Sequence, residues 1–227
     1  SGFTVISTVG TSTANAEFMR INGEEPVYGA GLAYVIHHGI VRDIVQQEPE
    51  WSGGAYNCPN VYGQIILTLP ANATYYTYAL RATFVDSLQT RTMTDFSALQ
   101  LSATGGSPKT ENGISGGMPV VSSSEGLFYN LSNVWAHHWS EFISSNSGSG
   151  IMFTTDANFK LYVFDRIAAQ KVGALEISSS AKTIELNPVG RLQFSFTTSL
   201  DVTWFGAVVT FDDEPIYPDL GGNIGLW

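Results

Sequence analysis

The alternation of apolar and polar side chains along short stretches is the feature that most constrains how this chain folds. It is clearest in TYYTYALRATFV, residues 74–85. The apolar positions of this stretch are Tyr76, Tyr78, Leu80, Ala82 and Phe84, and its polar positions are Thr77, Arg81 and Thr83. Because successive side chains of a β-strand point to opposite faces, this period of two predicts a strand with one buried face.

Similar runs recur along the whole chain with turn-forming residues between them. Examples are VYGQIILTL at 61–69, FKLYVFD at 159–165 and VTWFGAVVTF at 202–211. Roughly ten to thirteen short strands, with few helical segments between them, are typical of antiparallel folds. The sequence therefore predicts an all-β protein, an antiparallel β-sandwich or jelly-roll-like domain.

Two stretches of the chain stand out because they lack charged or apolar side chains, and they suggest how it is organised into segments. Residues 1–16 contain no charged side chain and form an N-terminal extension or donated strand in this interpretation. Residues 17–227 are predicted to be one β-sandwich domain, because the strand pattern has the same character throughout. A long Gly/Ser loop near 102–117 lacks the apolar side chains that a core segment needs.

One short helix is expected around residues 133–143. Its apolar positions, spaced i, i+3, i+4 and i+7, are Trp135, His138, Trp139 and Phe142. The polar run SSNSGSG at 144–150 is predicted to end the helix as an exposed loop. This helix is expected to lie against a sheet and to bury its tryptophans there.

No cofactor is predicted, and the metal hypotheses are weak. Histidines occur only as the adjacent pairs 37–38 and 137–138, without the spacing of a zinc motif. An acidic turn near the C-terminus offers oxygen ligands that Ca²⁺ accepts. The weak candidates are Asp212, Asp213, Glu214, His38 and His138.

Charge composition excludes nucleic acid as a partner. The chain has 20 acidic and 10 basic side chains and a net charge of −10, with no cluster of lysines or arginines. Binding to a phosphate backbone needs such cations to displace counterions. No apolar run approaches the roughly 20 residues that span a bilayer, so no transmembrane segment is expected.

Several features favour an extracellular or cell-surface location. The first residues, SGFTVISTVG, are those expected after removal of a signal peptide. Asn72 and Asn130 each open an Asn-X-Ser/Thr sequon, so both are candidate glycosylation sites. Charged residues are 13 % of the chain, against about 25 % in a typical soluble domain, which suits a subunit whose surface is covered by neighbours.

The two ends of the chain predict how copies would assemble. The first segment is rich in β-branched residues, and the last ends in an apolar Leu-Trp pair. Donating a terminal strand to the open sheet of a neighbour supplies main-chain hydrogen bonds and, repeated, builds a fibre. The predicted assembly residues are Phe3, Val5, Ile6, Val9 and Trp227. Pairing of the first segment within its own chain is the alternative.

In composition the chain is similar to secreted all-β subunits of prokaryotic, particularly archaeal, surface filaments, which are Ser/Thr/Tyr-rich, poor in lysine and sequon-bearing. The first functional hypothesis is thus an exported, non-enzymatic structural subunit that self-assembles into a cell-surface filament, tube or layer. Its partners would be copies of itself and glycans.

The second hypothesis is a jelly-roll carbohydrate-binding or carbohydrate-cleaving protein. Glycosidases of this kind set two carboxylates across a groove lined by aromatic rings. The candidate aromatic residues are Trp51, Trp135, Trp139 and Trp204, and the candidate carboxylates are Glu125, Glu141 and Asp156. No two of these carboxylates form a recognisable glycosidase motif, so the chain is not predicted to be an enzyme.

Overall fold

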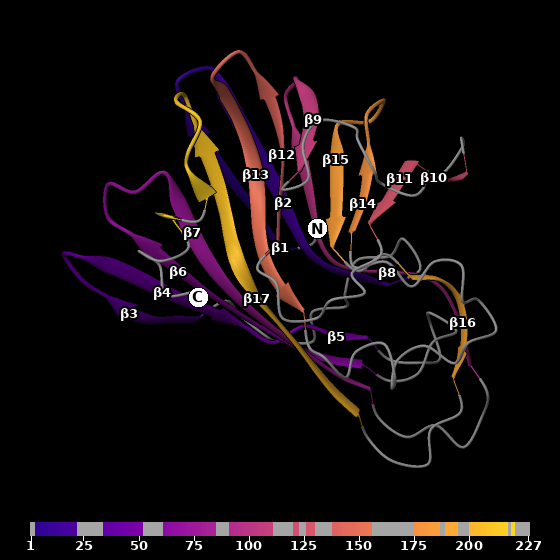
Figure 1. The fold of residues 1–227 in the computed structure, drawn as a ribbon. Coiled ribbons are helices and arrows are strands. Elements are labelled where there is room, and N and C mark those ends of the chain that lie inside the picture. The colour runs from indigo at the N-terminus through magenta and orange to yellow at the C-terminus, as the bar shows by residue number, and fades with distance from the viewer. Residues whose placement is uncertain are drawn as a thin grey trace.

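A computed structural model shows the fold as an antiparallel β-sandwich, which confirms the predicted fold class (Figure 1). The residues that the structure describes are 3–21, 34–51, 61–84, 91–110, 120–122, 126–129, 138–155, 175–186, 189–194, 200–217 and 219–220. Seventeen strands are assigned among them.

Sheet A contains eight strands in the order β1-β2-β8-β15-β14-β11-β10, and β16 also pairs with β8. Its strands are β1 (Phe3–Val9), β2 (Ser12–Ile21), β8 (Arg91–Ala103), β10 (Val120–Ser122), β11 (Gly126–Tyr129), β14 (Leu175–Ser178), β15 (Thr183–Leu186) and β16 (Val189–Phe194). Every pairing in it is antiparallel.

Sheet B contains nine strands in the order β3-β4-β6-β7-β17-β13-β12-β9, and β5 pairs with β6. Its strands are β3 (Tyr34–His38), β4 (Arg42–Gln47), β5 (Glu50–Trp51), β6 (Val61–Pro70), β7 (Tyr75–Phe84), β9 (Ser107–Thr110), β12 (His138–Ser144), β13 (Ser147–Thr155) and β17 (Leu200–Phe211). These pairings are antiparallel as well.

The two sheets bury their facing sides against each other. The Phe18 ring of β2 meets the Tyr78 ring of β7 edge to face, with centroids 6.1 Å apart. The hydroxyls of Ser7 in β1 and Thr210 in β17 are hydrogen-bonded between the sheets. The largest fully buried side chains of this interior include Trp204, Phe18, Phe142, Phe153, Ile65 and Leu67.

The strand predicted for residues 74–85 is confirmed as β7. Its side chains at Tyr76, Tyr78, Leu80 and Ala82 are buried, while those between them are half-buried or exposed. The buried Tyr78 hydroxyl donates a hydrogen bond to the Met152 carbonyl of β13, 3.0 Å away. Gly206 of β17 pairs with both Tyr78 and Phe153, and its missing side chain leaves room for the tyrosine.

The predicted helix around 133–143 is wrong where the structure describes it, because residues 138–144 form β12. Trp139 and Phe142, assigned to one helix face, lie on opposite faces of this strand. Phe142 faces sheet A, where the Lys182 ammonium lies 5.6 Å from its ring centroid. The helical spacing was also compatible with a strand, and pairing with β9 and β13 decided between them.

Both predicted loops contain strand residues in the part of the chain that the structure describes. Within 102–117, residues 102 and 103 end β8 and Ser107–Thr110 form β9, an edge strand beside β12. Within 144–150 only a tight turn remains, and β13 begins at Ser147. Ser145 adopts a φ of 58° in that turn. Backbone pairing placed these polar stretches in the sheet although their side chains carry no strand signal.

The N-terminal segment pairs within its own chain. Seven residue pairs join β1 to β2, from Phe3 with Phe18 to Val9 with Ser12. Gly10 in the intervening turn has a φ of 57°. This is the alternative to strand donation, and β1 consequently forms one edge of sheet A.

Replacing Gly206 by alanine should destabilise the sandwich. A Cβ at this position would overlap the Met152 carbonyl and the Tyr78 ring. Overpacking of this kind costs roughly 1–3 kcal/mol of unfolding free energy, measured by urea denaturation. The control is Gly105→Ala, since nothing lies within 4 Å of a Cβ there. Equal losses in the two variants would contradict the role given to Gly206.

Candidate functional site

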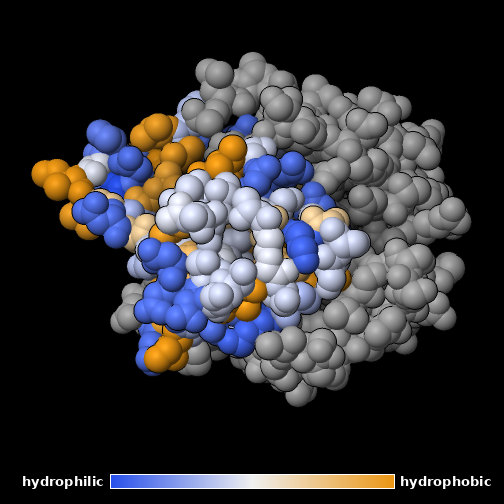
Figure 2. Space-filling model, turned by 90° about the horizontal axis from the view of Figure 1, so that it is seen from above, coloured by the Kyte–Doolittle hydropathy of each residue, from blue (hydrophilic) through white to orange (hydrophobic). Residues whose placement is uncertain are grey.

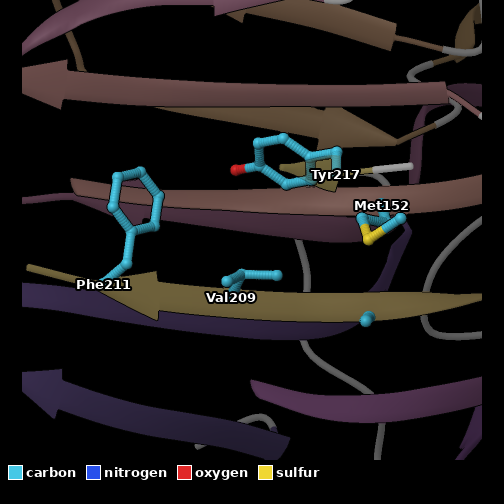
Figure 3. Packing of buried hydrophobic residues seen from close by; sticks show 5 residues of the cluster. Met152, Val209, Phe211 and Tyr217 are labelled. Carbon is cyan, nitrogen blue, oxygen red and sulfur yellow. The ribbon is translucent and has the colours of Figure 1, made fainter. Parts of the chain in front are cut away.

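The chain folds back after β17 and covers part of the outer face of sheet B, the face turned away from sheet A. Here the C-terminal segment means residues 212–217 and 219–220. Its Tyr217 packs on the buried side chains of Met152, Val209 and Phe211, as Figure 3 shows. Gly150 lies beside the Tyr217 hydroxyl, because a Cβ there would approach this oxygen to 2.7 Å. The segment therefore occupies a slot shaped by β12, β13 and β17.

Glu141 of β12 is the ionisable centre of this slot. Its side chain is fully buried, and the Tyr217 hydroxyl donates a hydrogen bond to Glu141 Oε2 over 2.6 Å. Lys109 Nζ lies 3.8 Å from Glu141 Oε1 and forms a closer ion pair with Glu214. Trp139 stacks on Tyr217 with ring centroids 4.5 Å apart and an interplanar angle of 5°. These four partners join β9, β12 and the C-terminal segment.

The electrostatics of the slot favour an uncharged Glu141. Burial away from water raises the pKa of Glu141 from 4.5 to about 7. The hydrogen bond from Tyr217 and the charge of Lys109 lower this pKa, whereas the nearby Glu214 raises it. Burial also raises the pKa of Tyr217 well above its ordinary value, with a further contribution from the Glu141 charge. Tyr217 is therefore a neutral hydrogen-bond donor.

A carboxyl with a pKa near 7 suits general acid catalysis, but Glu141 has no exposed surface. Tyr217 covers it, and no substrate reaches it in this state. Trp139 is stacked beneath Tyr217, and Trp204 is buried in the interior at 0 % exposure. The predicted sugar groove is therefore wrong for these three residues. The side chains of the other candidates for this groove, Trp51, Trp135, Glu125 and Asp156, lie outside the part of the structure that is described.

The weak metal candidates do not converge in the part of the chain that the structure describes, where no group of three His, Cys, Asp or Glu residues is placed to hold an ion. Asp212 and Asp213 are exposed, and Glu214 pairs with Lys109. His38 Nδ1 lies 2.8 Å from Asp43 Oδ1 at the end of β3. The side chain of His138 lies outside the described residues, although its backbone belongs to β12.

A second candidate region is the hairpin of β3 and β4, which projects from the sandwich (Figure 1). All five residues of β3 are exposed. Figure 2 shows apolar surface at this projecting end. The exposed apolar side chains are Tyr34, Val35 and Ile36 of β3, with Ile40 at 97 % and Val41 at 76 % exposure in the turn. Contiguous exposed apolar surface is a feature of many interaction sites, so this hairpin is a candidate site.

A groove of about 180 Å³ runs beside β1, close to this hairpin. One wall is the β1 stretch from Val5 to Val9, and the other is formed by Leu69, Pro70 and residues 73–76 around the β6–β7 turn. Ile6 of β1 is 67 % exposed. Tyr76 borders the groove, and its buried hydroxyl has no hydrogen-bond partner among the described residues. We call β1, the β3–β4 hairpin and this groove the open side.

A polar groove of about 310 Å³ lies elsewhere, along β5, β6 and β7. Its lining residues include Glu48, Glu50, Tyr62, Gln64, Arg81 and Thr83. Tyr62 is 43 % exposed and offers an aromatic surface beside carboxylate and guanidinium groups. None of the predicted carbohydrate-binding tryptophans has a described side chain in it.

Sequence analysis identified Glu141, Trp139 and Glu214 separately but missed Lys109 and Tyr217, which connect them. The sequence offered one signal for Tyr217: the apolar pair Ile216-Tyr217 interrupts an acidic turn, which indicates that this turn packs against the protein. The predicted assembly residues Val5, Ile6 and Val9 all border the groove beside β1. The side chain of Phe3, and Trp227 and Asn130, lie outside the described part of the chain.

Comparisons with known proteins reveal no family. No family model and no curated protein matches the chain. Among solved structures, it is similar to two crystal structures of the GH36 alpha-galactosidase AgaA from Geobacillus stearothermophilus, one of them in complex with stachyose. The identity is 10 % and the TM-scores are 0.37 and 0.36, over 92 % of this chain but 29 % of the galactosidase chain. So weak a likeness carries no argument about activity.

Within the described residues, no helix has the length and apolar character needed to cross a membrane.

The stability of the folded chain should fall as the pH rises from 4.5 to about 7 because of Glu141. Its pKa in the folded state, about 7, exceeds the ordinary value of 4.5. The folded state therefore retains a proton that the unfolded chain releases in this range, and the stabilisation present below pH 4.5 is lost. Urea denaturation across this range measures the slope, and Glu141→Gln should make it shallower.

The wild type and Glu141→Gln share all other titratable groups. The difference between their curves of stability against pH therefore reports the titration of Glu141. A second variant, Tyr217→Phe, removes the hydrogen bond that lowers the Glu141 pKa in the folded state, so the upper end of the pH-dependent range should move upward. It should also cost roughly 1–3 kcal/mol, because a buried carboxyl oxygen loses its donor. Stability curves that stay parallel for the wild type and Glu141→Gln would contradict this assignment.

Proposed function

We propose that this chain is a non-enzymatic structural subunit that is exported and assembles with copies of itself into a filament, tube or layer. The observation that carries this proposal is the difference between the edges of the two sheets. Among the strands that the structure describes, two edge strands carry features that block pairing with another chain, and two do not. The open side contains both unprotected edges.

The protected edges are β9 and β10. β9 has four residues and includes Pro108 and Lys109, and β10 has three residues. Short length, proline and lysine are the usual means of blocking a sheet edge. By contrast, β1 has seven residues and β3 has five, and neither contains proline or a lysine, arginine or carboxylate. An edge strand without these devices is suited to pairing with another strand.

Charge supports self-association at the same place. Two copies with a net charge of −10 each repel one another where acidic side chains meet. Because β1 and β3 carry no carboxylate, pairing through these two strands brings no acidic side chain of either strand into the contact, although Asp43 of β4 lies beside β3. The predicted role of Val5, Ile6 and Val9 is retained as an edge and groove contact in this proposal.

Export is supported by the position of Asn72. This sequon residue lies exposed in the four-residue turn between β6 and β7, with a φ of 57°. An exposed turn is accessible to glycosylation.

Introducing a positive charge on either unprotected edge should weaken assembly. The variants are Ile6→Lys in β1 and Ile36→Lys in β3, and an edge lysine opposes strand pairing. We expect association constants at least about tenfold lower, a loss of about 1.4 kcal/mol, by sedimentation velocity. Negative-stain microscopy should show fewer or shorter assemblies.

The matched control is Ile216→Lys. Ile216 is 68 % exposed, close to the 67 % of Ile6, and lies in the C-terminal segment. It should assemble as the wild type does. A wild-type chain that stays monomeric at high concentration, or equal weakening by all three lysines, would refute assembly through the open side.

The second candidate function, carbohydrate binding, is supported by the polar groove along β5, β6 and β7. Its volume of about 310 Å³ is near the lower limit of roughly 300 Å³ for small-molecule sites. Tyr62 would stack on a sugar ring, and Glu48, Glu50 and Arg81 would bind its hydroxyls. A glycan array should then give signals that Tyr62→Ala removes; a blank array eliminates this candidate.

A further inference from the structure

We propose that the C-terminal segment is a pH-dependent strap. While Glu141 is protonated, the segment stays docked on the outer face of sheet B. When Glu141 ionises, the segment opens more readily, and both sheets remain intact. Opening uncovers the apolar side chains on which Tyr217 packs, those of Met152, Val209 and Phe211 (Figure 3). This movement takes place within one copy of the chain and does not depend on self-assembly.

The register of sheet B builds the slot in which the strap docks. One row of paired residues crosses β9, β12, β13 and β17, and its members are Lys109, Glu141, Gly150 and Val209. Directly paired residues present their side chains on the same face of a sheet. Because Gly150 has no side chain, the row has a gap between Glu141 and Val209, and the Tyr217 hydroxyl lies beside this gap. The slot thus belongs to the sheet and persists when the segment leaves it.

Side chains, and not a strand ladder, hold the strap in place. Among the described residues, no main-chain hydrogen bond joins the segment to sheet B. Tyr217 donates its hydrogen bond to Glu141 and stacks on Trp139. Glu214 forms an ion pair with Lys109. A segment attached in this way opens without breaking the pairing of any strand, and such local openings need less free energy than unfolding of the whole domain.

The charge of the docked slot depends on Glu141. Among the described side chains, the charged or titratable groups that face it are Lys109 of β9 and Glu214 and Tyr217 of the segment. β13 contains no titratable residue, and neither does the neighbouring stretch of β17, residues 205–211. With Glu141 protonated, the charges of Lys109 and Glu214 balance. With Glu141 ionised, the slot holds one uncompensated negative charge.

Ionised Glu141 is poorly solvated while the strap is docked. Its side chain has no exposed surface, and Oε1 has no hydrogen-bond partner among the described residues. A buried carboxylate without such partners is costly, whereas a carboxylate in water is not. Opening of the segment admits water to this oxygen. Ionisation therefore favours the open state.

The direction of the pH dependence follows from proton linkage. Burial raises the pKa of Glu141 to about 7 in the docked state, and opening returns this pKa toward 4.5. Opening therefore releases a proton between these two values. The opening equilibrium constant should rise by up to about tenfold per pH unit from pH 4.5 to about 7 and level off above that. The strap is docked most firmly below pH 4.5.

Labelling of introduced cysteines tests the strap. In a Cys58→Ser background, Val209→Cys lies on the face that the segment covers, and Val208→Cys lies beside it in β17 but faces sheet A. Both positions are 0 % exposed. At low protein concentration, a pyridyl disulfide is added at pH 5 and at pH 7.5. Each labelling rate is divided by the rate of the same cysteine in a Glu141→Gln chain, so that the titration of the thiol cancels.

The ratio for Val209→Cys should rise at least about tenfold from pH 5 to pH 7.5. At pH 7.5, Val209→Cys should also be labelled at least about tenfold faster than Val208→Cys, which needs separation of the sheets. A ratio that does not change with pH overturns the role of Glu141. Equal labelling of the two cysteines at pH 7.5 overturns the strap, because the segment then opens only when the domain unfolds. Met152→Cys, on the covered face of β13, gives the same measurement if Val209→Cys does not fold.

Discussion

The structure depends on the stacking of two sheets that do not extend equally far. Wherever sheet A covers sheet B, alternate side chains of β6, β7 and β17 are buried in a common interior. Beyond the edge of sheet A, the side chains of β4 are mostly half-buried and those of β3 are exposed. Apolar surface that one sheet leaves uncovered favours contact with another part of the protein or with another molecule.

The two regions that sheet A leaves uncovered differ in what contacts them. On the outer face of sheet B, the C-terminal segment covers Met152, Val209 and Phe211, and Tyr217 connects it to Glu141. Burial in that contact raises the pKa of the Glu141 carboxyl, so we expect the stability of this covering to depend on pH. At the open side, the described residues supply no comparable cover for Ile36, Ile40 and Val41. In the proposed assembly, a second copy covers them.

Sequence patterns predicted the parts of the structure that depend on local alternation. The strand at 74–85 and the antiparallel sandwich were predicted because buried and exposed side chains alternate within single strands. The helix at 133–143 was not correct, because an i, i+3, i+4, i+7 spacing of large residues also occurs when both faces of a strand are covered. For β12, one face is covered by sheet A and the other by the C-terminal segment, and neither neighbour is visible in the local pattern.

By itself the sequence determined the fold class, the acidic and lysine-poor character of the surface, and the uncharged nature of the first strand, because these properties belong to single residues or to their period of two. Only the tertiary structure decided that β1 pairs with β2, that Lys109, Glu141, Glu214 and Tyr217 meet, and that β3 is exposed among the described residues. Those outcomes depend on contacts between residues far apart in the chain, where the gain from burial and pairing at one place competes with every other arrangement of the same strands.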